Sequence, residues 1–133
     1  MKGDMDDLPL ILVVDDEADF REILSVKLAS VGFHVETAEN GQEGIEKAKR
    51  LKPKLVLMDV KMPVMDGAMA ALVLREDPET RAIKVVFLTS LGDPRLDMED
   101  IDRKFSAMAG AVQYIKKTDN LENIAEQVKQ FAA

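Results

Sequence analysis

Residues 10–17 read Leu-Ile-Leu-Val-Val-Asp-Asp-Glu, five apolar residues followed directly by three acidic ones. A short apolar run of this kind is typical of a buried strand. A second run, residues 55–58, ends in the same way at Asp59. Because two unit charges ~4 Å apart repel by roughly 4 kcal/mol at an effective dielectric near 20, carboxylates gathered at strand ends need a cation, a proton or a basic side chain. The pattern predicts a carboxylate cluster that holds a divalent cation.

Short apolar runs alternate with longer amphipathic stretches along the whole chain. The predicted strands are residues 10–14, 35–38, 55–58, 85–88 and 113–115, and the predicted helices are residues 19–31, 41–52, 68–76, 95–109 and 121–131. The apolar positions of the first helix are Phe20, Ile23, Leu24, Val26 and Leu28. The alternation is typical of an α/β fold with a parallel sheet. Because most of the strands are too apolar for a sheet with a wet face, we expect helices on both faces.

Length and charge limit the possible functions. A chain of 133 residues, 47% of them apolar, fits one domain with one core. We expect residues 1–8 to form a flexible acidic leader and residues 9–133 to form the domain. The 18 basic residues against 25 acidic ones argue against a nucleic-acid partner, because such binding relies on lysine and arginine at the phosphates.

The absence of cysteine excludes disulfides, thiol catalysis and thiolate zinc sites. It is also compatible with a reducing compartment. No apolar run approaches the ~18 residues of a membrane span, and no signal peptide is visible. We therefore expect a cytoplasmic protein with no membrane partner.

Polar side chains are predicted at the carboxyl ends of the strands, where open parallel sheets bind their ligands. They are Asp15 and Asp16, Asp59, Thr89 and Lys117. A single aspartate after a strand is more often a helix cap or turn residue, but three together favour a metal site. Carboxylate oxygens suit Mg²⁺, which takes one or two protein carboxylates and keeps several waters.

These residues and their neighbours resemble the receiver domains (CheY-like domains) of two-component response regulators. The matching groups are Asp15-Asp16-Glu17, Asp59 with Met62-Pro63 and Met65-Asp66-Gly67, Thr89-Ser90, and Tyr114 with Lys117. The resemblance covers about residues 10–131. It implies a flavodoxin-like, doubly wound fold whose five-stranded parallel sheet has the order 2-1-3-4-5, with five helices on the two faces.

The resemblance implies roles for the acidic residues. Asp59 would accept a phosphoryl group from a phosphohistidine and, as an acyl phosphate, help to hold Mg²⁺. Asp16 would bind the metal directly, Asp15 through water, and the backbone carbonyl of Lys61 would complete the protein ligands. Phosphoryl transfer needs positioning and neutralisation of oxygen charge, which such a site supplies.

The resemblance also implies a switch. Lys117 would pair with the phosphoryl oxygens, and Thr89 would donate its hydroxyl to them. Tyr114 would then move inward. The neighbouring Lys116 competes for the role of Lys117, but strand alternation favours Lys117.

Partners follow from the same resemblance. The phosphoryl donor would be a sensor histidine kinase or a histidine phosphotransfer protein, and a downstream target protein would read the switch. No output domain is visible, so the chain is expected to act through protein contacts, as a monomer or a phosphorylation-dependent dimer. A receiver cut from a longer protein is the alternative.

Two departures from the family pattern are visible. Thr118 replaces the usual proline after Lys117, which predicts a trans peptide bond because a non-proline cis bond costs about 2.5–4 kcal/mol. The segment from Thr89 to Lys117 is longer than usual and acidic, and it is either a solvated loop and helix start or a partner-specific surface. The resemblance also implies that Lys61 and Leu91 stand at positions that flank the path of the attacking water, and these two residues predict slow self-dephosphorylation.

Two other classes of function would use similar residues. An aspartate-nucleophile phosphatase of the haloacid dehalogenase type would need a second aspartate two residues after Asp59, where Lys61 stands. A receiver-like docking module that is never phosphorylated would not need the full set of acidic residues, Thr89 and Lys117. The sequence therefore favours a signalling receiver that is not an enzyme.

Overall fold

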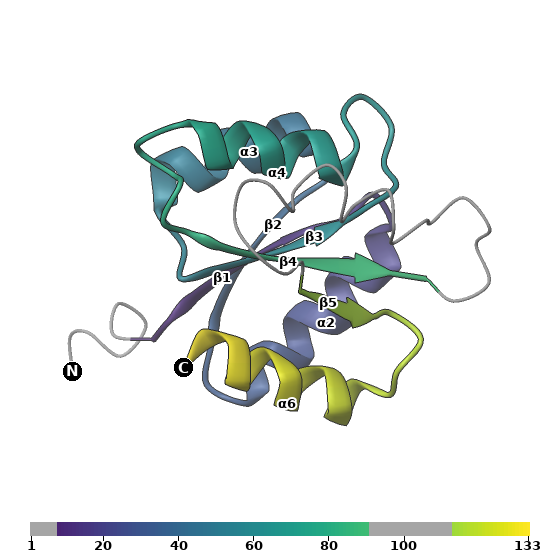
Figure 1. The fold of residues 1–133 in the computed structure, drawn as a ribbon. Helices are drawn as coiled ribbons and strands as arrows, with labels where there is room; N and C mark the ends of the chain where they lie inside the picture. Colours follow the sequence, from purple (N-terminus) through teal and green to yellow (C-terminus); the bar gives the residue numbers. More distant parts are fainter. Residues whose placement is uncertain (1–7, 91–112) are drawn as a thin grey trace.

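The computed structural model describes residues 8–90 and 113–133. Five strands form one parallel sheet in the order β2-β1-β3-β4-β5 (Figure 1). They are β1 (Leu10–Val14), β2 (His34–Ala38), β3 (Leu55–Asp59), β4 (Lys84–Thr89) and β5 (Tyr114–Lys116). The predicted fold class and strand order are confirmed.

Helices cover both faces of the sheet, as its apolar strands require. The described helices are α2 (Ala18–Ser30), α3 (Gly41–Leu51), α4 (Gly67–Glu76) and α6 (Leu121–Ala132). Helices α3 and α4 lie on one face, and α2 and α6 lie on the other (Figure 1). The helix predicted at residues 95–109 lies outside the described residues, as do residues 1–7 of the predicted leader.

The sheet divides the core into two apolar clusters. Successive strand residues point to opposite faces, so Leu12 and Val14 pack with α3 and α4, whereas Ile11 and Val13 pack with α2 and α6. Every residue of β3 is buried. Strand β3 lies at the centre of the sheet, which explains why its sequence is an unbroken apolar run before Asp59.

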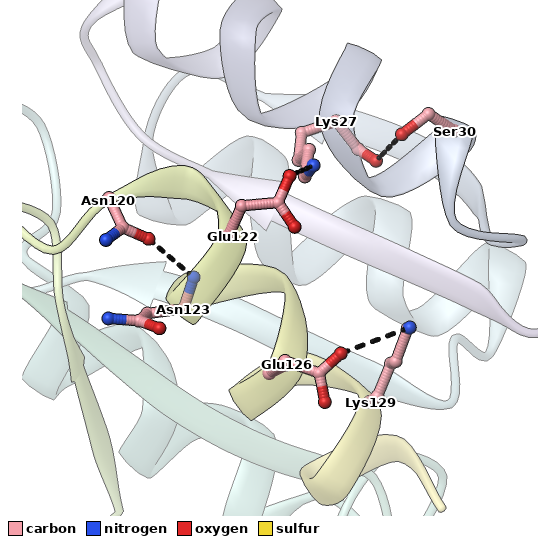
Figure 2. Close-up of polar contacts among 7 residues, drawn as sticks. All are labelled: Lys27, Ser30, Asn120, Glu122, Asn123, Glu126 and Lys129. Carbon is pink, nitrogen blue, oxygen red and sulfur yellow. Dashed lines mark hydrogen bonds and ion pairs between the residues drawn. The ribbon is translucent and has the colours of Figure 1, made fainter.

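Side chains cap three of the helices. The carboxamide oxygen of Asn40 accepts a hydrogen bond from the backbone N–H of Glu43 at 2.9 Å, so Asn40 is the N-cap of α3. Asp66 caps α4 in the same way. Asn120 caps α6, and Figure 2 shows this bond beside the ion pair of Lys27 with Glu122 that joins α2 to α6.

Helix α2 buries only part of its apolar positions. Leu24 and Leu28, one turn apart, are fully buried, but Ile23 and Val26 are 50% and 66% exposed. A helix has 3.6 residues per turn, so these two side chains point away from the stripe that Leu24 and Leu28 form. Apolar spacing therefore does not by itself give the width of the buried face.

The described residues contain no cis peptide bond, so the Lys117–Thr118 bond is trans, as predicted. Among those residues, no helix combines the length and the apolar character that crossing a membrane requires.

Candidate functional site

Three carboxylates meet at the carboxyl ends of β1 and β3. These strands are neighbours, with Val14 opposite Met58, so the residues that follow lie side by side. One carboxylate oxygen from each of Asp15, Asp16 and Asp59 lies within 4.8 Å of the other two. Asp15 and Asp59 are buried, whereas Asp16 is exposed. The cluster is therefore open to solvent on one side.

Backbone contacts fix the position of Asp15. Its N–H donates to the carbonyl of Ala38 at 3.1 Å, and its own carbonyl accepts a hydrogen bond from Nη1 of Arg21 at 2.7 Å. The Oδ1 atom of Asp15 accepts a further hydrogen bond from the backbone N–H of Glu17 at 2.8 Å. The sequence gives no sign of this role for Arg21, because an arginine in the first turns of a helix usually faces solvent.

Lys117 supplies the positive charge of the site. Its ammonium nitrogen lies 2.7 Å from Oδ2 of Asp15 and 3.7 Å from Oδ2 of Asp59, and it also pairs with Glu17. It lies 4.6 Å from the centroid of the Phe20 ring, within reach of a cation–π interaction. The Lys117 side chain is 7% exposed.

The two neighbouring lysines at the end of β5 differ in their surroundings. The side chain of Lys116 is exposed, and Lys117 is the lysine that reaches the cluster. The carboxylate of Glu17 also pairs with Lys117. No pattern in the sequence indicated this pair, since the two residues are far apart in the chain.

Burial, together with neighbouring charges, shifts the pKa values of the site. Burial and the neighbouring charge of Asp15 raise the pKa of Asp59 to about 7, although Lys117 and a backbone hydrogen bond from Lys61 oppose the shift. Burial also raises the pKa of Asp15, against the effect of Lys117. Burial disfavours the charged form of Lys117, but its contacts with Asp15 and Glu17 outweigh this and raise its pKa.

The cluster fits a small divalent cation. Oδ2 of Asp15 is buried and lies 2.7 Å from the ammonium of Lys117, and an ionised carboxylate oxygen has more than one lone pair. It therefore keeps capacity for a further ligand. Hard carboxylate oxygens, two of them buried and one exposed, suit Mg²⁺ with some of its waters retained.

The remaining predicted residues lie around this cluster. Thr89 ends β4 and is 7% exposed. It lies one residue beyond Leu88, which is the register partner of Asp59. Tyr114 begins the edge strand β5 and is 44% exposed. The N–H of Lys61 bonds to Asp59, and Leu91 lies outside the described residues. The structure thus brings the aspartates and Lys117 together and leaves Tyr114 on the surface.

Known proteins are similar to this chain in sequence. The family model for the response regulator receiver domain matches residues 11–129. A DNA-binding dual master transcriptional regulator of Synechocystis, RpaA, is 30% identical over 92% of this chain and 48% of its own length. The chain thus spans about half the length of the transcriptional regulators that it matches. Protein PilH of Pseudomonas aeruginosa is 32% identical over 92% of this chain and 97% of its own.

A solved structure shows the same fold with a ligand. The response regulator TrrA of Thermotoga maritima, crystallised with Mg²⁺ and BeF, superposes with a TM-score of 0.76 and 30% identity, covering 93% of this chain and 99% of TrrA. The family model spans nearly all of the sheet and its helices. The chain therefore belongs to the response regulator receiver domain family.

Proposed function

We propose that this receiver is a magnesium-dependent switch, acting in the cytoplasm, that accepts a phosphoryl group on Asp59 from a phosphohistidine of a sensor kinase or histidine phosphotransfer protein. One observation carries the proposal. Asp59 is buried, and it lies close enough to the carboxylates of Asp15 and Asp16 to share a cation with them. The ammonium of Lys117 lies 3.7 Å from Oδ2 of Asp59. A signalling role of this kind needs no enzymatic turnover of a substrate.

The transfer step balances as a displacement at phosphorus. A carboxylate oxygen of Asp59 forms the new P–O bond while the P–N bond to the imidazole breaks, and the imidazole nitrogen keeps the electron pair and takes up a proton. The product is an acyl phosphate. Lys117 is placed to approach the phosphoryl oxygens, because its ammonium already lies next to Asp59.

Asp59 must be ionised to act as the nucleophile. With a pKa of about 7 in the metal-free domain, it is partly protonated near neutral pH. Mg²⁺ held by Asp15, Asp16, Asp59 and the backbone carbonyl of Lys61 would supply charge neutralisation that favours the ionised form. Metal binding and readiness for phosphorylation are therefore coupled.

The signal is proposed to pass through Thr89 and Tyr114 to a downstream target protein. A hydrogen bond from the Thr89 hydroxyl to a charged phosphoryl oxygen is worth about 1.5–3 kcal/mol. Shifting an equilibrium from 1:99 to 99:1 takes about 5.5 kcal/mol. Thr89 alone is too weak, so Lys117 and the metal must share in moving Tyr114 from its exposed position.

Phosphorylation by a small-molecule donor tests the proposal. The full chain is incubated with Mg²⁺ and acetyl phosphate, and intact mass is measured. We expect the wild type to gain one phosphoryl group, Asp59→Asn to gain none, and the matched control Asp19→Asn, at an exposed position in α2, to behave as the wild type. Equal labelling of Asp59→Asn, or none of the wild type, would overturn the proposal. The label should also decay slowly, as Lys61 and Leu91 predict.

A further inference from the structure

Glu17 makes a contact that the proposed function does not use. It is the N-cap residue of α2, yet its side chain makes no capping hydrogen bond. Its carboxylate instead pairs with the ammonium of Lys117. The Glu17 side chain is 62% exposed and Lys117 is 7% exposed, so the carboxylate covers the ammonium from the solvent side.

The start of α2 holds the ammonium of Lys117 on its own side of the site. Glu17 and Asp15 both contact the ammonium, and the backbone N–H of Glu17 holds the carboxylate of Asp15. The ring of Phe20 lies beside the same nitrogen. Asp59, at 3.7 Å, is the more distant of the buried carboxylates. Lys117 is therefore positioned toward Asp15 and Glu17 before any phosphoryl group is present.

We propose that Glu17 is a positioning residue that restrains Lys117 in the unphosphorylated domain and so weakens the capture of a phosphoryl group at Asp59. This inference rests on the proposed function. A phosphoryl group on Asp59 offers Lys117 new anionic partners, and Glu17 competes with them for the same ammonium. Removing the charge of Glu17 frees Lys117 for that group without touching the predicted metal ligands.

The expected effect is modest because the pair is half open to water. Exposed ion pairs contribute about 0.2–1 kcal/mol, so Glu17→Gln should bind an acyl-phosphate mimic about 1.4- to fivefold more tightly than the wild type. Salt screens exposed charges. The advantage of the variant should therefore shrink as sodium chloride is raised from about 50 mM to about 500 mM.

The experiment is a titration of the full chain with beryllofluoride in the presence of Mg²⁺, followed by backbone amide chemical shifts. Glu22→Gln is the matched control, because it removes the same charge from an exposed position of the same helix. We expect Glu22→Gln to bind as the wild type does. The ¹⁵N signal of the Lys117 ammonium gives a second readout, and its protons should exchange faster with water in Glu17→Gln.

The outcomes separate the two proposals. If the wild type binds beryllofluoride and Glu17→Gln binds equally or more weakly, or if Glu22→Gln gains as much, the role of Glu17 is wrong and the proposed function stands. If the wild type does not bind beryllofluoride with Mg²⁺, the proposed function fails, and the role of Glu17 fails with it.

Discussion

Gly67 lies so close to Asp59 that a Cβ atom at position 67 would be 2.1 Å from the Asp59 carbonyl oxygen. The N–H of Gly67 also donates to the carbonyl of Val60 at 2.8 Å, which holds the start of α4 against the end of β3. The backbone around Asp59 is therefore set by a contact that only glycine permits. This relationship links the packing of α4 to the position of the proposed phosphorylation site.

Gly67→Ala should therefore destabilise the domain and weaken its metal binding. Forcing a methyl group into a packed contact costs typically about 1–3 kcal/mol, and here the obstacle is backbone, which cannot rotate away. Urea unfolding and a Mg²⁺ titration measure the two effects. Gly32→Ala is the control: Gly32 has φ of +103° with nothing within 4 Å, so it should lose stability but keep its Mg²⁺ affinity. Unchanged stability of Gly67→Ala would contradict the prediction.

The two adjacent lysines should respond very differently to substitution. Lys117→Met removes the ammonium that contacts the fully buried carboxylate of Asp15. Breaking a buried pair by removing one partner costs about 3–5 kcal/mol. The free energy of unfolding of Lys117→Met should therefore fall by at most this amount at pH 8. The loss should be smaller at pH 5, where Asp59 takes up a proton.

Lys116→Met is the matched control, because that side chain is exposed and should change stability by less than about 0.5 kcal/mol. Urea unfolding of both variants at the two pH values gives the comparison. Adding Mg²⁺ should recover part of the stability of Lys117→Met. Similar losses for the two variants would contradict the assignment of Lys117 to the site.

The carboxylate cluster could be predicted from the sequence because a parallel sheet brings the carboxyl ends of its strands to one edge. Asp15 follows β1 and Asp59 ends β3, and the register of Val14 with Met58 places them side by side. The location of a strand-end residue can thus be predicted from the local sequence pattern. The same logic placed Thr89 and Lys117 at that edge.

Contacts made by helix side chains could not be predicted in this way. The pair of Glu17 with Lys117 joins residues that are 100 positions apart, and nothing in the local pattern of either one indicates the other. Arg21 is similar, since its partner is a backbone carbonyl. Ile23 and Val26 are exposed although both are apolar and lie at helical spacing, so the local pattern does not settle which apolar helix residues join the core.

Val64→Gly should stabilise the domain. Val64 has φ of +71° in the loop after β3 and is 81% exposed. Positive φ is strongly unfavourable for a β-branched residue and costs about 1–3 kcal/mol. Glycine adopts this conformation freely, although it loses about 0.5–1 kcal/mol through the entropy of the unfolded chain. We expect a net gain of about 1 kcal/mol in urea unfolding.

The same substitution at Val26 is the control for this prediction. Val26 is also exposed, but it lies inside α2, where glycine costs about 1 kcal/mol relative to alanine. Val26→Gly should therefore lose stability while Val64→Gly gains it. A loss in both variants would show that the Val64 backbone is not strained.

The metal-free domain should become less stable as pH rises from about 4 to about 7. The pKa of Asp59 is raised from 3.8 to about 7 in the folded state, so between these values the native state binds more protons than the unfolded chain. Stability falls with pH wherever the unfolded state binds fewer protons. At about 1.4 kcal/mol per pKa unit, Asp59 alone accounts for up to about 4 kcal/mol.

Two comparisons isolate this effect. Asp15 has a raised pKa as well and acts in the same direction, so Asp59→Asn should flatten the slope without abolishing it. The raised pKa of Lys117 acts only above its ordinary value of 10.5, outside this window. Because Mg²⁺ binds the ionised carboxylates, it should stabilise the wild type more at pH 8 than at pH 5, and Asp59→Asn should show a smaller difference. Urea unfolding from pH 4 to pH 8, with and without Mg²⁺, measures both slopes. An equal slope in the wild type and in Asp59→Asn would show that the Asp59 carboxyl group is not perturbed by its buried, acidic surroundings.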